Sequence, residues 1–148
     1  METTNNLHEV NGNHYECLKY EPVTLFQVFN LNWFQAEPIK YISRFWNKHG
    51  ITDLKKAKHI MSMAEDMGIT IPINLTIDEK LLSAYCYQFH VYFNASHDPS
   101  INQEYFMLYV RLITKIIFAN WVEAMEVLDR IVYYFYGKEE QEYASETN

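Results

Sequence analysis

The chain has 148 residues, of which 49% are hydrophobic and 16% aromatic, a composition typical of one folded domain with its own core. Its 19 acidic residues outnumber the 12 lysines and arginines. The resulting formal net charge of −7 argues against nucleic-acid and anionic-membrane partners. Cys17 and Cys86 are too few for a disulfide framework, and neither a leader peptide nor a bilayer-length apolar run is evident. We therefore expect a reduced, cytoplasmic protein.

The distribution of polar and apolar residues predicts three regions. Residues 1–13 are polar and are expected to form a flexible N-terminus. Residues 14–137 are expected to form a single helical domain, followed by a disordered acidic tail at 138–148. The chain has only four glycines and four prolines, which disfavours an all-β sandwich with many tight turns.

The first elements of the domain follow from prolines and apolar spacing. A short helix is expected at 22–29, because Pro22 can occupy its first turn. A connection at 30–35 follows, in which the large side chains of Trp33 and Phe34 are expected to fill the core.

A helical hairpin is expected next. Its first helix covers 38–50 and ends at Gly50, which suits a left-handed C-terminal residue. Its second helix runs from about 53 to 67, and Thr52 and Asp53 are expected to cap its start. The apolar residues expected to face the core are Ile39, Ile42, Phe45 and Trp46 on the first helix and Leu54, Ala57, Met61 and Ala64 on the second.

The residue pattern in the second half of the domain predicts three longer helices. Residues 69–75 contain Pro72 and are expected to be an extended crossover. Thr76 and Glu79 have the spacing of a capping box and are expected to open the next helix. The three helices are expected at 76 to about 94, 101–118 and 120–137, the last beginning at Asn120 with Glu123 three residues on. The predicted fold class is all-α: a single-domain bundle of about five helices with antiparallel neighbours.

The hairpin is strongly basic although the whole chain is acidic. Half of the 12 basic residues fall there: Lys40, Arg44, Lys48, Lys55, Lys56 and Lys58. On a helix, Lys40, Arg44 and Lys48 would lie along one face without an acid at the i+4 positions, so that their charges repel. The lysines at 55–58 fall in the first turns of the second helix, where the dipole disfavours cations and favours bound anions. A solvated helix face remains the alternative, but the pattern favours an anion site.

Several familiar catalytic motifs are absent. With glycines only at positions 12, 50, 68 and 137, neither a P-loop nor a dinucleotide-binding turn can be formed. Cys86 and His90 are one helical turn apart, but two residues do not make a zinc site, and a core role is favoured for both. We therefore predict no metal site and assign no catalytic residue.

Two aromatic runs cover more than one helix face. They are Tyr85-Cys86-Tyr87-Gln88-Phe89 and Tyr133-Tyr134-Phe135-Tyr136. Either they combine core residues with surface tyrosines, or they form a subunit interface, which favours Tyr and Phe. On the second interpretation the protein is a homo-oligomer.

The order of motifs over about residues 14–67 resembles a small phage-encoded family. The matching segments are His14-Tyr15, Glu21-Pro22-Val23, Ile39-Lys40-Tyr41-Ile42 followed by Arg44, Lys48 with Gly50, and Asp53-Leu54 followed by Lys56-Ala57. The family consists mostly of proteins of unknown function. Its members are often labelled nucleotide kinases, and some phosphorylate deoxynucleoside monophosphates without a P-loop. Ala36-Glu37 stands where the family has Gly-Asn, and Thr24 where it has Asp.

The resemblance implies a phage protein in the cytoplasm of a bacterial host and a nucleotide as its ligand. The residues implied for binding are His14, Tyr15, Lys40, Tyr41, Arg44, Lys48, Asp53 and Lys56. In that interpretation Lys40, Arg44 and Lys48 bind phosphate oxygens, and Lys56 adds charge. A kinase would also need ATP and Mg²⁺.

The sequence leaves some residue roles and functions open. Asp53 could hold Mg²⁺ or orient Arg44, and Tyr15, Tyr41 or Trp46 could stack on a base. The two alternative functions are a non-catalytic anti-defence protein that sequesters a nucleotide signal for the benefit of the phage, and an oligomeric helical interaction protein.

Overall fold

The computed structural model describes residues 26–27, 29–45, 48–71, 76–96 and 102–137, with backbone only for 89–96 and 102–103. Its labelled helices are α3 (Trp33–Arg44), α4 (Ile51–Asp66), α5 (Glu79–Ser96), α6 (Asn102–Ile117) and α7 (Trp121–Tyr136). No strand occurs within these ranges, which confirms the predicted all-α class. None of the described helices is long and apolar enough to cross a bilayer. The expected N-terminal region and tail, and nearly all of the helix expected at 22–29, lie outside the described residues.

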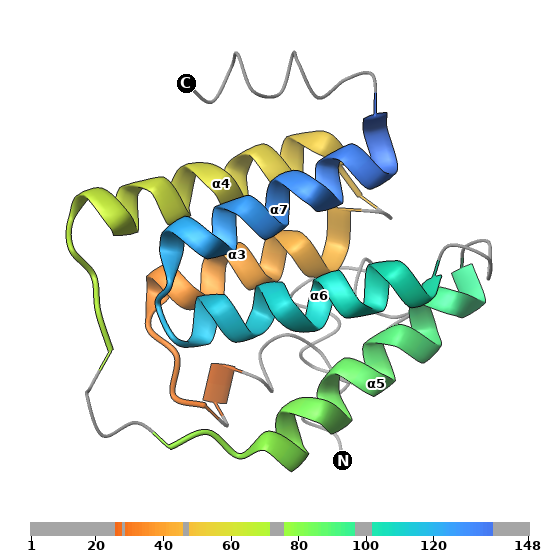
Figure 1. Cartoon of the computed structure of the whole chain (residues 1–148), viewed down its shortest axis with the longest axis horizontal. Coiled ribbons are helices and arrows are strands. Elements are labelled where there is room, and N and C mark those ends of the chain that lie inside the picture. The colour runs from red at the N-terminus through yellow and green to blue at the C-terminus, as the bar shows by residue number, and fades with distance from the viewer. Residues whose placement is uncertain (1–25, 28, 46–47, 72–75, 97–101, 138–148) are drawn as a thin grey trace, which may run out of the picture.

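Four of the helices form a closed ring of contacts. α3 packs on α4, α4 on α7, α7 on α6, and α6 on α3. α5 lies outside this ring, where it packs on α6 and crosses below it in the view of Figure 1. The hairpins α3–α4 and α6–α7 are antiparallel because short connections join their helices.

The core lies inside the ring, and the predicted stripes supply much of it. Ile39 and Ile42 on α3 are fully buried, and Phe45 is 1% exposed. On α4 the predicted residues Leu54, Ala57, Met61 and Ala64 are all fully buried. α6 and α7 add a second group: Tyr105, Tyr109, Leu112, Ile113, Ile116, Ile117, Trp121, Ala124, Val127, Leu128, Ile131 and Val132.

The start of α3 differs from the prediction. The helix begins at Trp33, because Asn32 and Gln35 form a capping box: the Asn32 Oδ1 accepts the Gln35 N–H at 3.0 Å, and the Gln35 Oε1 accepts the Asn32 N–H at 2.9 Å. Pro38 therefore lies inside the helix. The expected connection at 30–35 is wrong in its second half, and Trp33 is 53% exposed, so it does not fill the core.

The turn between α3 and α4 also differs. α3 ends at Arg44, so Lys48 lies in the turn rather than on the helix face expected to carry it. α4 begins at Ile51, with Gly50 at its N-cap (φ 58°, ψ −134°), so Thr52 and Asp53 are already inside the helix. The Gly50 N–H donates to the Phe45 carbonyl at 2.8 Å, which closes the turn.

The remaining helix ends agree more closely with expectation. α4 is followed by Gly68 in a left-handed conformation (φ 66°), and α7 by Gly137 (φ 44°). α5 begins at Glu79 rather than at Thr76, because the Asp78 Oδ1 accepts the Leu81 N–H at 3.1 Å and acts as the cap. Residues 72–75 of the expected crossover lie outside the described ranges.

Candidate functional site

The packing of α3 on α4 brings basic side chains onto one tyrosine ring. The Lys40 Nζ lies 4.9 Å, the Arg44 Cζ 4.8 Å and the Lys56 Nζ 5.5 Å from the centre of the Tyr41 ring. These distances are within the range of cation–π attraction. We call Lys40, Tyr41, Arg44, Lys48 and Lys56 the Tyr41 cluster.

Lys48 shares the electrostatic field of this cluster although it lies in the turn. Desolvation and the positive charges of Arg44, Lys56 and Lys40 lower the pKa of Lys48, and Asp53 acts in the opposite direction. Lys48 therefore stays close enough to Lys40 and Arg44 to interact with their charges, although it does not share their helix. Because Lys48 and Lys56 are exposed, a ligand from solvent can reach both.

Beneath the cluster, Asp53 is a fully buried carboxylate. The Arg44 Nη2 lies 3.5 Å from its Oδ1, and the backbone N–H of His49 donates to its Oδ2 at 3.3 Å. The His49 Nδ1 lies 3.5 Å from Oδ1. Asp53 therefore connects the end of α3, the turn and the first turn of α4.

The surroundings of Asp53 favour one of the two roles considered for it. Its two oxygens face Arg44 and His49, and its side chain has no exposed surface, so Mg²⁺ could not reach it without breaking these contacts. Within the described residues, no three His, Cys, Asp or Glu side chains come close enough together to hold a metal ion. The residues present thus do not fit Mg²⁺, and the geometry agrees with the orienting role.

Arg44 itself keeps one unused donor. Its Nε is buried and has no hydrogen-bond partner among the described residues, while the residue as a whole is 9% exposed. A buried donor without an acceptor is unfavourable by about 1–3 kcal/mol. Because this atom has almost no exposed surface, an oxyanion beside Tyr41 could accept from it only after the surrounding side chains moved.

Two ion pairs modify the expected charge pattern. The Lys40 Nζ lies 2.7 Å from the Glu37 Oε2, so Lys40 has an acidic partner three residues earlier although no acid occupies its i+4 position. The Glu37–Lys40 spacing of three residues could have revealed this pair. The Lys58 Nζ lies 3.1 Å from Asp129 on α7, which directs Lys58 away from the cluster.

The cluster lies next to the N-terminal turn of α4. Asp53 belongs to that turn, and Lys56 follows less than one turn later. The dipole of a 16-residue helix such as α4 favours an anion at this end and disfavours the lysines. A bound anion would interact favourably with the helix dipole and would also offset the unfavourable position of the lysines.

Not all predicted site residues can be placed. His14, Tyr15 and Trp46 lie outside the described residues. Lys40, Tyr41, Arg44, Lys48, Asp53 and Lys56 come together around the hairpin. The sequence interpretation missed His49, although its spacing of four residues from Asp53 was a usable signal.

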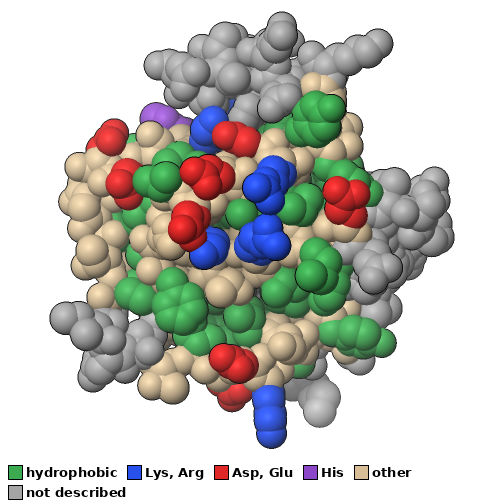
Figure 2. Space-filling model, in the orientation of Figure 1, with side chains coloured by type: hydrophobic (Ala, Val, Ile, Leu, Met, Phe, Trp, Pro, Cys, Tyr) green, Lys and Arg blue, Asp and Glu red, His purple; other side chains and the backbone are tan. Residues whose placement is uncertain are grey.

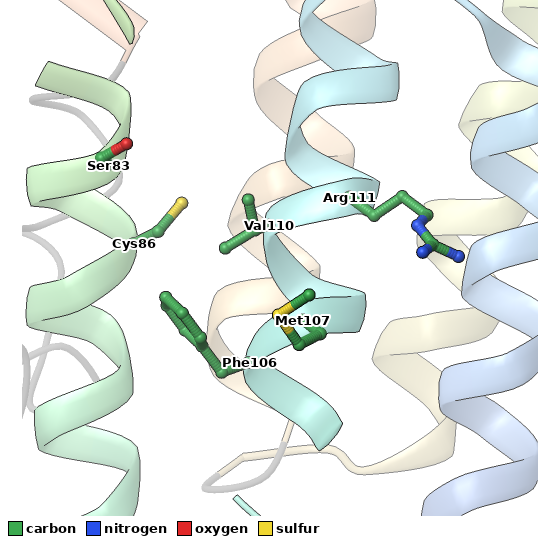
Figure 3. A pocket seen from close by; sticks show the side chains of 6 residues that line it. All are labelled: Ser83, Cys86, Phe106, Met107, Val110 and Arg111. Carbon is green, nitrogen blue, oxygen red and sulfur yellow. The ribbon is translucent and has the colours of Figure 1, made fainter. Parts of the chain in front are cut away.

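Two hollows elsewhere suit an anion less well. One, of about 380 Å³, lies between α5 and α6 and is lined by Ser83, Cys86, Phe106, Met107, Val110 and Arg111. In Figure 3, Cys86 faces Val110 and Phe106 across the gap, while Arg111 extends away toward α7. Burial raises the pKa of the Cys86 thiol to about 12, which makes the thiolate scarce at neutral pH.

The second hollow, of about 610 Å³, is lined by Glu104, Leu108, Asp129, Arg130, Tyr133 and Tyr134. Its charged residues carry both signs. Figure 2 shows the same mixture on the face formed by α4, α7 and α6, where acidic side chains lie around the basic ones. This face therefore lacks the excess of positive charge found in the Tyr41 cluster.

The aromatic runs divide between core and surface. Tyr85 is buried, whereas Tyr87 and Tyr133 are 59% and 62% exposed. Tyr134, Phe135 and Tyr136 are partly buried and pack against the core. Homo-oligomerisation through these residues stays a prediction.

Comparison of the chain with protein-family models, with curated proteins and with solved structures gives no match. The phage family therefore stays an expectation from the sequence motifs.

Proposed function

We propose that the Tyr41 cluster binds the phosphate groups of a nucleotide. The observation that carries this proposal is the convergence of three cationic groups within 5.5 Å of the centre of one tyrosine ring. Lys48 adds its positive charge to the same field, and an anion placed among these groups is attracted by the charges that Glu37 and Asp53 do not offset. The motif resemblance, which implies a nucleotide ligand, supports the same conclusion.

The charges of the site suit a phosphate dianion. Glu37 offsets Lys40, and Asp53 offsets Arg44. Within the described part of the chain no ion pair offsets Lys48 or Lys56, and both side chains are exposed. We assign the direct phosphate contacts to Lys48 and Lys56, while the largely buried Arg44 adds positive charge beneath them.

Binding is favoured over catalysis. A kinase of this type would neutralise and position phosphoryl groups with the help of Mg²⁺. Asp53, the acidic residue that the resemblance implies for the site, is buried against Arg44 and His49. This observation favours a protein that captures a nucleotide, as in the sequestering alternative, over one that phosphorylates it.

Calorimetry with deoxynucleoside mono-, di- and triphosphates tests the proposal, and the nucleosides without phosphate are the ligand control. Replacing Lys48 or Lys56 by Met should weaken phosphate-dependent binding about tenfold, since each loses one charged hydrogen bond. Lys80→Met, at an exposed position of α5, should leave binding unchanged. No binding of any nucleotide at millimolar concentration, or equal binding by all variants, contradicts the proposal.

A turnover assay separates capture from catalysis. The protein is mixed with ATP, Mg²⁺ and each deoxynucleoside monophosphate, and the products are separated by chromatography. Binding without product formation is expected for a sequestering protein. Formation of a nucleoside diphosphate would instead establish the kinase.

A further inference from the structure

We propose that Tyr41 is a positioning residue of the anion site: its ring holds Lys40, Arg44 and Lys56 in place before a ligand binds. This inference rests on the proposed function, because it concerns how the same site is assembled. It also replaces the base-stacking role considered for Tyr41, since the cations already lie over its ring.

The position of Tyr41 explains how one ring can serve three cations. Lys40 and Arg44 are its neighbours on α3, one residue before and three residues after it. Lys56 arrives from α4, which packs along α3. The ring therefore lies at the point where the two helices bring their basic side chains together.

Three cations converge on one ring, whereas a chain of 148 residues would be expected to hold about two such contacts in all. Energetically significant cation–π contacts occur roughly once per 70–80 residues in proteins. The Tyr41 ring is half-buried, and the attraction between a cation and a ring grows as water is excluded. The ring thus offsets part of the repulsion among the cations, and of the three only Lys56 is exposed.

A purely structural role for Tyr41 is the competing explanation. Tyr41 also packs against the core, so its loss could simply loosen the hairpin. The two roles differ in what can replace the ring. A filler of space can be a leucine, whereas a site for cations requires an aromatic face, which phenylalanine keeps and leucine lacks.

The test uses inorganic pyrophosphate, because a probe without a base excludes any contribution from stacking. Calorimetry compares the full-length protein with Tyr41→Phe and Tyr41→Leu, and Tyr133→Leu on the exposed surface of α7 is the matched control. We expect Tyr41→Phe and Tyr133→Leu to bind like the original protein, and Tyr41→Leu to bind about tenfold more weakly. Equal affinity of Tyr41→Leu overturns the inference and leaves the proposed function standing.

A second measurement does not depend on a ligand or on the stability of a variant. In the NMR spectrum of the unaltered protein, ring currents should move the side-chain methylene signals of Lys40 and Lys56 upfield from their ordinary positions. Tyr41→Phe should keep these shifts. Their absence in the unaltered protein overturns the inference even if Tyr41→Leu does not fold. If the original protein binds neither pyrophosphate nor any nucleotide, the proposed function is contradicted instead.

Discussion

Asp53 is the residue that joins the charges of the hairpin to its backbone. A fully buried carboxylate is tolerated only where its oxygens are paired, and here they face the Arg44 guanidinium and accept the His49 N–H. The same contacts tie the end of α3 to the first turn of α4. The Arg44 guanidinium is consequently held against Tyr41.

Replacing Asp53 by Asn should lower the free energy of unfolding by about 2–4 kcal/mol, because the buried Arg44 charge would lose its counter-charge. Urea unfolding measures this loss. Asp66→Asn, at an exposed position at the end of the same helix, should stay within about 0.5 kcal/mol of the original protein. Similar midpoints for the two variants would show that the Asp53–Arg44 pair is not structurally important.

At the scale of elements, the α3–α4 hairpin depends on the backbone at Gly50. Its φ of 58° and ψ of −134° lie in a region that residues with a Cβ rarely adopt. A Cβ at this position would also lie 3.2 Å from the Tyr136 hydroxyl of α7. A glycine is therefore strongly favoured at this position of the turn, which also contains Lys48.

Gly50→Ala should destabilise the protein by about 1–3 kcal/mol, since both the backbone and the contact with Tyr136 would be strained. Gly68→Ala is the matched comparison, because Gly68 also has a positive φ but has open space around it. Gly68→Ala should lower the free energy of unfolding by about 1 kcal/mol, because only its left-handed backbone would be strained. Thermal unfolding of both variants checks the difference, and a larger loss in Gly68→Ala would be the contrary result.

At the scale of the whole molecule, the bundle buries ionisable groups in their neutral forms. Desolvation raises the pKa of the Cys86 thiol from 9.0 to about 12. Desolvation, together with neighbouring tyrosines, raises the pKa values of Tyr105 and Tyr109 well above their ordinary range. These groups lie on α5 and α6, so their protonation is linked to the packing of these helices.

We expect stability to fall under alkaline conditions. The folded state holds these protons more tightly than the unfolded chain, so the contribution of Cys86 to stability is complete below pH 9 and is lost as the pH rises toward about 12. Urea midpoints measured from pH 7 upward should therefore decline once Cys86 can ionise in the unfolded chain. Cys86→Ala should reduce this decline, and Tyr133→Phe, at an exposed position, should not. A pH-independent midpoint would contradict the expectation.

Much of the fold could be predicted because its signals are local. Hydrophobic spacing located the buried stripe of α4, and Gly68 and Gly137 marked helix ends. The predicted start and end of α3 differ from the observed ones. The Asn32–Gln35 capping box starts α3 before Pro38, and α3 ends at Arg44, before Lys48.

The sequence by itself determined the all-α class, the order of the helices and the concentration of positive charge in the hairpin. Those properties follow from spacing along the chain, which a sequence displays directly. Only the tertiary structure decided that Lys56 meets Lys40 and Arg44 on Tyr41, and that Asp53 is buried. The reason is physical: these contacts depend on how α3 and α4 pack and on the path of the turn at Gly50, and neither is set by any single segment.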